Sequence, residues 1–174
     1  MRFNTKRLAI RPMTPDDLSA SFEHRSCALT SRYIGEPATY EQAKTRLLEG
    51  CQPWQAQENE RLALAITLQS NGRLIGELMF KYVNKASLIG EIGYRLHKDF
   101  IGQGYAFEAV SLFVERLFVE QEVMKITALC AIENIASWKL MEKLGMQREG
   151  HLRRHFQLST QRSDAYYYGL CRDE

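Results

Sequence analysis

Three strand-like runs follow one another closely between residues 62 and 96, and this feature constrains the fold more than any other. Leu62 to Gln69 and Leu74 to Val83 are joined through Asn71-Gly72, a pair that tolerates positive φ and therefore suits a tight hairpin. Ser87 to Leu96 follows as a third run with recurring apolar residues. Neighbouring strands with such short connections pair antiparallel, so we expect a mainly antiparallel sheet in the middle of the chain.

Helices and further strands surround this sheet in the sequence. Capping residues and amphipathic spacing predict helices that begin at Pro15, at Thr39 or Tyr40, and after Gly104. The other expected elements are a strand from Thr5 to Arg11, helix ends near Cys27 and Trp54, strand Val123 to Ile132, helix Asn134 to Leu144, and strands Met146 to Leu158 and Asp164 to Leu170. This order, β-α-α-β-β-β-α-β-α-β-β, predicts a single α+β domain over residues 1–174, with a mixed sheet flanked by helices.

Composition excludes several classes of protein. Of the 174 residues 45% are hydrophobic, enough for a core that requires no disulfide or metal. The 23 basic and 21 acidic residues leave a net charge of +2, too weak a field for a general nucleic-acid binder. No apolar run reaches the roughly 18 residues of a membrane span, and charges interrupt the N-terminus before any signal-peptide core. We expect a cytoplasmic protein that binds neither nucleic acid nor membrane.

Cysteine and histidine spacing gives no sign of a metal site. The cysteines are far apart, contain no C-x-x-C pair and indicate reduced thiols in a reducing compartment. The histidines lack metal-ligand spacing and suit surface or core positions. The residues concerned are Cys27, Cys51, Cys130 and Cys171, and His24, His97, His151 and His155. We expect no bound metal.

The segment from Leu96 to Ala106 carries the clearest functional pattern. In it Gly102-Gln103-Gly104 lies between a strand and a strongly amphipathic helix. The first turn of a helix has unpaired N–H donors and a partial positive charge, so a pyrophosphate can bind there without a basic side chain. A Walker loop is excluded because no Gly-Lys-Ser/Thr follows, and a Rossmann fingerprint because Phe107 replaces its third small residue. Taken alone, the two glycines fit a simple strand-to-helix turn equally well.

The context of this loop closely resembles the GNAT family of N-acetyltransferases over nearly the whole chain. GNAT proteins carry Gln/Arg-x-x-Gly-x-Gly/Ala between the fourth strand and the next helix, and that frame falls on Ile101-Gly102-Gln103-Gly104-Tyr105-Ala106. Ile101 departs from the pattern, which removes one polar side chain and leaves the backbone donors. The resemblance implies a GNAT-like fold, acetyl-CoA as cosubstrate, and a pyrophosphate held by Ile101 to Ala106.

Within the family the chain looks most like the Rim-type branch, the ribosomal-protein N-terminal acetyltransferases. Three stretches carry the likeness: Glu91-Ile92-Gly93-Tyr94-Arg95-Leu96, then Asn134-Ile135-Ala136-Ser137 with Glu142-Lys143-Leu144-Gly145-Met146, and Gly150-His151-Leu152-Arg153. These stretches are specific for the family and much less so for the acceptor.

The resemblance implies direct attack of an amine on the thioester through a tetrahedral intermediate. The Leu96 amide would hold the thioester carbonyl where the fourth strand diverges from its neighbour. Glu91 would accept the proton of the attacking amine. The alternative is that Glu91 has no catalytic role and is an exposed acid paired with a neighbouring Lys or Arg. Asn134 would bind the pantetheine, although it also suits an ordinary helix cap. Ser137 would contact the cofactor. Met141 stands where many family members have a Tyr, so Ser137 would protonate the leaving thiolate, the alternatives being water or no enzyme group at all.

The acceptor follows less directly from the sequence. A protein N-terminal amine, such as that of a ribosomal protein, has a reference pKa of ~7.7 to 8.0 and is easily deprotonated. The second hypothesis is a small amine, namely a polyamine, an aminoglycoside or an amino-acid derivative. A cationic acceptor would require converging acids, for which Glu36, Glu41, Glu58 and Glu60 are the candidates. A non-catalytic CoA-binding module is the third hypothesis, and a homodimer stays open.

Overall fold

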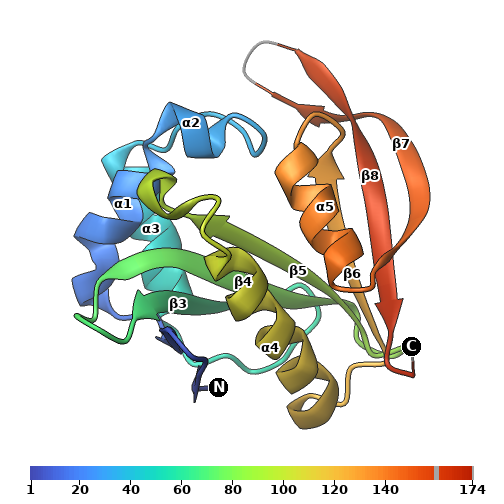
Figure 1. Cartoon of the computed structure of the whole chain (residues 1–174), viewed down its shortest axis with the longest axis horizontal. Coiled ribbons are helices and arrows are strands. Elements are labelled where there is room, and N and C mark those ends of the chain that lie inside the picture. Colours follow the sequence, from blue (N-terminus) through green and yellow to red (C-terminus); the bar gives the residue numbers. More distant parts are fainter. Residues whose placement is uncertain (159–160, 174) are drawn as a thin grey trace.

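An eight-stranded sheet runs through the computed structural model, which describes residues 1–158 and 161–173 (Figure 1). The strands are β1 (Phe3–Asn4), β2 (Leu8–Pro12), β3 (Leu62–Leu68), β4 (Leu74–Asn84), β5 (Ile89–Leu96), β6 (Lys125–Ala131), β7 (Gln147–Gln157) and β8 (Arg162–Cys171). They lie in the order β1-β2-β3-β4-β5-β6-β8-β7, and only β5 and β6 run parallel. The predicted α+β fold with a mixed, mainly antiparallel sheet is confirmed.

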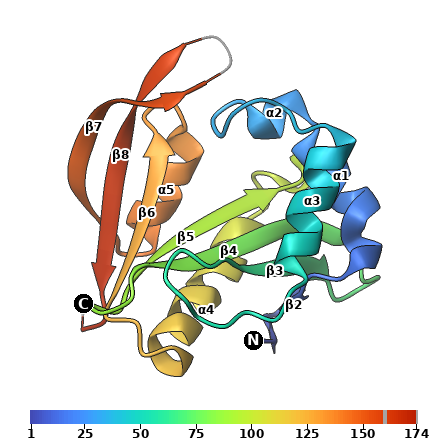
Figure 2. The ribbon, with the colours of Figure 1, turned by 180° about the vertical axis from the view of Figure 1, so that it is seen from behind.

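Helices cover both faces of this sheet. They are α1 (Leu18–Arg25), α2 (Ala28–Ser31), α3 (Tyr40–Gly50), α4 (Tyr105–Glu120) and α5 (Ile135–Lys143), with short 3-10 turns η1 (Pro15–Asp17) and η2 (Lys98–Phe100). Figures 1 and 2 show α4 and α5 on one face and α1, α2 and α3 on the other. Two predicted helix starts are confirmed by their caps: Thr39 Oγ1 accepts from the Gln42 N–H at 3.3 Å, and Asn134 Oδ1 from the Ser137 N–H at 3.4 Å.

Some local predictions differ from the structure. The run from Thr5 to Arg11 is not one strand, because the Thr5 N–H donates to the Leu8 carbonyl at 2.9 Å and the chain turns there, folding β1 back on β2. The second helix ends at Gly50, before Pro53, whose ring disfavours helical backbone in the preceding residue. No periodic pattern predicts α2 and η2, since elements of about one turn are too short to show a period.

The main core lies between the sheet and the face that carries α4 and α5. Phe80 on β4 and Ile92 on β5 point to this face and are buried against α4. On α4 itself Val110, Phe113 and Leu117 are fully buried, which confirms the predicted apolar stripe. A smaller cluster under α1 and α3 consists of Met13, Leu47, Ala65 and Leu74. The two clusters fix the helices on opposite sides of β3, β4 and β5.

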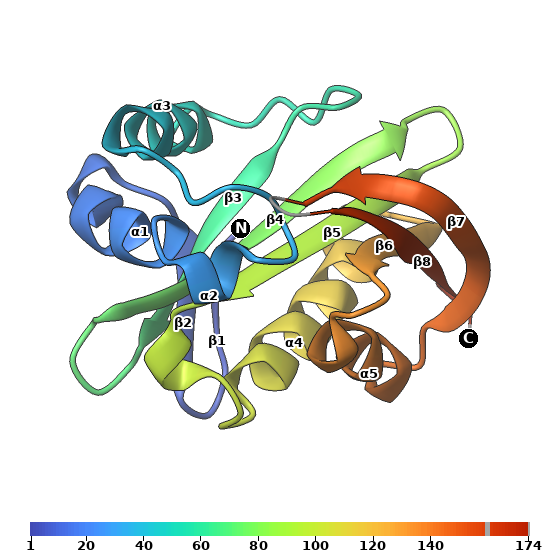
Figure 3. The same cartoon turned by 90° about the horizontal axis from the view of Figure 1, so that it is seen from above.

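Strands β5 and β6 pair over a short stretch and then separate. Their parallel register joins Ile89–Glu91 to Lys125–Thr127. Beyond it β5 continues along β4 to Leu96, and β6 continues along β8 to Ala131. Figures 1 and 3 show the two halves of the sheet diverging from this point. The divergence therefore begins after Glu91, earlier on β5 than Leu96.

The two edge strands of the sheet are irregular in different ways. β1 has two residues. β7 shifts register against β8 between Arg148 and Gly150 and between Leu152 and Phe156, and most of its residues are exposed. Within residues 1–158 and 161–173, no helix has the length and apolar character required to cross a membrane.

Candidate active site

The loop between β5 and α4 presents a row of backbone donors. Gly102 (φ +78°) and Gly104 (φ +81°) adopt the left-handed conformation that favours glycine, and Gly104 caps α4. The first helical N–H with an acceptor is that of Glu108, which donates to the Gly104 carbonyl at 3.1 Å. In the described part of the chain, the amides of residues 102–107 donate to no other residue. These amides can therefore bind an anion.

The space beside the loop is open to a ligand. A Cβ built on Gly102 would meet no atom within 4 Å, so a ligand can approach the main chain there. Ile101 is exposed, and the Gln103 side-chain amide turns back to donate to the Asp99 carbonyl at 2.7 Å. The surface beside the loop is therefore main chain, bordered by the exposed apolar side chain of Ile101.

Arg7 ties the N-terminal hairpin to the same loop. Its Nε donates to Glu108 Oε2 at 2.6 Å, and its Nη1 donates to the Gln103 carbonyl at 3.1 Å. The guanidinium also lies 4.1 Å from the centroid of the Tyr105 ring, and Thr5 Oγ1 donates to Glu108 Oε1 at 2.6 Å. These contacts hold the first turn of α4 in place. The sequence did not single out Arg7, because its partner Glu108 lies 101 positions away.

The opening between β5 and β6 exposes backbone amides of β5. The His97 N–H donates to the Ile75 carbonyl on β4 at 2.7 Å, and successive residues of a strand direct their N–H groups to alternate sides. The amides of Tyr94 and Leu96 therefore face away from β4, into the opening that β6 leaves. An extended ligand can pair with them like an added strand.

Tyr94 and Ser137 meet across this opening. Tyr94 Oη lies 3.0 Å from Ser137 Oγ and donates to the Ser137 carbonyl at 3.2 Å. Burial raises the pKa of Tyr94 above its usual range, so the phenol keeps its proton. Ser137 is itself buried at the start of α5, beside its cap Asn134. Met141, which stands where many family members have a tyrosine, lies in the core, but Tyr94 brings a tyrosine hydroxyl to the same opening. The sequence did not predict the contact of Tyr94 with Ser137, because the two residues are 43 positions apart.

Glu91 lies on the sheet face that α1 and α3 cover, at the point where β5 and β6 separate. Its Oε1 is 3.2 Å from Nζ of Lys81, its cross-strand neighbour on β4. About a fifth of each side chain is exposed, 21% for Glu91 and 22% for Lys81. The Glu91 carboxylate is therefore paired with a lysine, which was the alternative to a role as proton acceptor. It remains accessible from the face that α1 and α3 cover.

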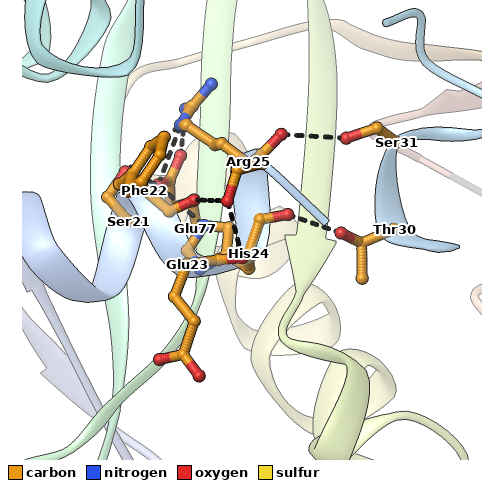
Figure 4. Close-up of polar contacts among 9 residues, drawn as sticks. Ser21, Phe22, Glu23, His24, Arg25, Thr30, Ser31 and Glu77 are labelled. Carbon is orange, nitrogen blue, oxygen red and sulfur yellow. Dashed lines mark hydrogen bonds and ion pairs between the residues drawn. The ribbon is translucent and has the colours of Figure 1, made fainter. Parts of the chain in front are cut away.

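A buried ionic network lies on the same face (Figure 4). The Glu77 carboxylate accepts hydrogen bonds from Ser21 Oγ at 2.6 Å and from Arg25 through both Nε and Nη2, and His24 Nε2 lies 2.9 Å from it. Burial alone would raise the pKa of Glu77, but the hydrogen bond with His24 and the charge of Arg25 outweigh it and lower the pKa to about 2. The network fastens α1 to β4.

The other acidic candidates do not gather into a site. Glu58 accepts from the Lys85 N–H, and Glu60 accepts from backbone N–H groups in its own loop. Glu36 and Glu41 are exposed. Among the described residues, no three His, Cys, Asp or Glu side chains come together as metal ligands would.

Comparison with known proteins gives independent evidence on the family of this chain. The family described as acetyltransferase (GNAT) domain matches residues 7–147. The chain is 31% identical to the uncharacterized N-acetyltransferase YnaD of Bacillus subtilis, with 100% of this chain and 99% of YnaD covered. The crystal structure of a GNAT-family acetyltransferase from Bacillus anthracis superposes with a TM-score of 0.88 at 27% identity, and both chains are fully covered.

Enzymes with different acceptors share this fold. RimL, a ribosomal L7/L12 α-N-protein acetyltransferase solved with coenzyme A, has a TM-score of 0.84 at 16% identity, with 98% of each chain covered. A chimera of the spermidine N-acetyltransferase SpeG from Vibrio cholerae and hSSAT has a TM-score of 0.81 at 18% identity, with 95% and 96% covered. With the domain matched over most of its length and a relative similar from end to end, this chain belongs to the GNAT family of acetyltransferases, which use acetyl-CoA.

Proposed function

We propose that this chain moves the acetyl group of acetyl-CoA to a primary amine, with a protein N-terminal α-amine as the leading acceptor. The observation that carries the proposal is the opening between β5 and β6, which directs the amides of Tyr94 and Leu96 toward a ligand on the strand that leads into α4. RimL, which shares the fold, acts on a protein α-amine. We place the reaction in the cytoplasm, because widely spaced cysteines without a C-x-x-C pair suit a reducing compartment.

The cosubstrate is held mainly by the main chain. The amides of Gly102 to Ala106 bind the diphosphate, and Ile101 and Gln103 form the outer part of the cradle. The guanidinium of Arg7 adds positive charge beside Gly104. Asn134 already caps α5, and its remaining hydrogen-bonding groups serve the pantetheine.

Each step of acyl transfer has a candidate group in the opening. Glu91 takes the proton from the attacking amine through water, since it lies five positions before Leu96 on β5, while Lys81 holds the carboxylate in place. The amide of Leu96 stabilises the negative oxygen that develops on the thioester carbon, and the amide of Tyr94 pairs with the pantetheine arm. Ser137 donates a proton to the departing sulfur and regains one from water, while Tyr94, whose phenol keeps its own proton, lies 3.0 Å away and orients the serine hydroxyl.

A product analysis tests the proposed function. The purified chain is incubated with acetyl-CoA and a panel of N-terminal peptides, spermidine, an aminoglycoside and free amino acids, and acetylated products are identified by mass spectrometry. We expect acetylation of peptide α-amines, with Glu91→Gln at least tenfold slower and calorimetric CoA affinity retained. Spermidine as the best acceptor would identify a small-molecule enzyme. Binding of CoA with no acetylated product would identify a binding module.

A further inference from the structure

Arg95 lies on β5 without a partner. Its direct cross-strand neighbour is Glu77, whose carboxylate oxygens are already occupied by Ser21, His24 and Arg25. Among the described residues, the Arg95 guanidinium makes no hydrogen bond and no ion pair. The side chain is half-buried, and a partly desolvated cation without an acceptor is disfavoured in a folded protein unless a ligand supplies the acceptor.

The surroundings of Arg95 carry excess positive charge. Burial and the charges of Arg25 and Arg46 lower the pKa of Arg95 to about 10, although the charge of Glu77 raises it. The next acid along the strand face, Glu91, is neutralised by Lys81. Arg25 and Arg46 thus repel the Arg95 guanidinium, and the carboxylate that attracts it, Glu77, is already bonded to Arg25. An additional anion would be attracted to this place.

Arg95 also lies on the face from which an acceptor can approach. Ile92 points into the core under α4, and side chains alternate along a strand, so Glu91 and Arg95 point to the opposite face. Because α4 and α5 cover the first face and border the cosubstrate in the proposed function, the amine arrives from the second. The Leu96 amide, which holds the thioester carbonyl in the proposed function, follows Arg95 directly in the chain. The long arginine side chain is therefore within reach of a carboxylate one or two residues beyond the reacting amine.

We propose that Arg95, flanked by Arg25 and Arg46, binds a carboxylate of the acceptor that lies one or two residues beyond the reacting amine. The planar guanidinium forms two parallel hydrogen bonds with a carboxylate, which sets orientation as well as affinity. The inference rests on the proposed acetyl transfer and specifies its acceptor class. An acidic peptide N-terminus is favoured, and a polyamine is repelled.

The test uses isosteric acceptors. Two peptides share an N-terminal Ser and differ only in having Asp-Asp or Asn-Asn at the next two positions, and spermidine is the cationic acceptor. For the native chain we expect kcat/KM at least tenfold higher for the Asp peptide than for the Asn peptide, mainly through KM, and lowest for spermidine. Arg95→Gln reduces the ratio between the peptides to about one, and Arg95→Lys restores part of it. Arg116→Gln, an exposed arginine paired with Glu120 on α4, keeps the native ratio.

The outcomes separate this inference from the proposed function. Thermal unfolding and CoA calorimetry of the Arg95 variants show whether each is folded and binds the cosubstrate. If both peptides react equally in the native chain, or the preference persists in Arg95→Gln, the acceptor site is wrong and acetyl transfer stands. If the native chain binds CoA and acetylates neither the peptides nor spermidine, both proposals fail.

Discussion

Glu77 joins three side chains of α1 through one buried carboxylate. Replacing it by Gln leaves Arg25 uncompensated, so we expect Glu77→Gln to lose about 3 kcal/mol of unfolding free energy at pH 7. The folded pKa, about 2, lies below the usual 4.5, so this contribution is complete above about pH 4.5 and disappears as the pH falls toward 2. Urea unfolding at pH 7, 4 and 3 should show the native chain converging on the variant.

The exposed pair of Arg116 and Glu120 on α4 provides the control for this substitution. Glu120→Gln makes the same chemical change on an exposed surface and should alter stability by less than about 0.5 kcal/mol. A Glu77→Gln deficit that stays constant from pH 7 to pH 3 would show that the carboxylate charge is not what stabilises α1.

The hydroxyls of Tyr94 and Ser137 act on the departing sulfur as one unit in the proposed chemistry. We expect Ser137→Ala to lower kcat about tenfold with the KM for acetyl-CoA nearly unchanged, a modest loss because a thiolate with a pKa near ~8.5 leaves without much help. Tyr94→Phe should cost a similar factor. Steady-state kinetics of the double variant then decide the point: a shared path gives a loss no greater than the larger single one, whereas multiplied losses indicate separate roles.

The glycine loop before α4 allows a matched comparison between two turns. Gly102 and Gly72 both have left-handed backbone, at φ +78° and +71°, and a Cβ would meet no atom within 4 Å at either. Alanine should cost each turn about 1 kcal/mol of strain. Only Gly102→Ala should raise the Kd of CoA, about tenfold by calorimetry, because its methyl group enters the space in front of the amides. Equal affinity in both variants would remove the loop from the binding site.

The elements with strong periodicity were predictable from sequence, and the contacts between them were not. The apolar stripe of α4 and the hairpin at Asn71-Gly72 each follow from a pattern within a few residues. The hydrogen bonds of Thr5 and Arg7 with Glu108 join residues more than one hundred positions apart. Sequence alternation grouped Glu91 with Arg95, yet only the packing of α1 and α3 shows which face they share.

The whole molecule consists of two half-sheets joined through a short parallel register, Ile89–Glu91 with Lys125–Thr127. A cosubstrate in the opening would contact both halves and stabilise the folded chain. With acetyl-CoA at about 100 times its Kd, the gain is about 2.7 kcal/mol. For a chain of this size that corresponds to a rise in Tm of about 5 to 10 °C, measurable by differential scanning fluorimetry. An unchanged Tm at this excess would place the ligand elsewhere or exclude its binding.

The irregular margins of the sheet affect how copies of the chain meet. A long, flat outer strand is a template on which another molecule can extend the hydrogen-bond ladder, the first step of aggregation. Here one margin stops after two residues, and the other is bent at Arg154, whose φ is +51°, and carries further charge on Arg148 and Arg153. Ladder growth from molecule to molecule is therefore disfavoured at both margins.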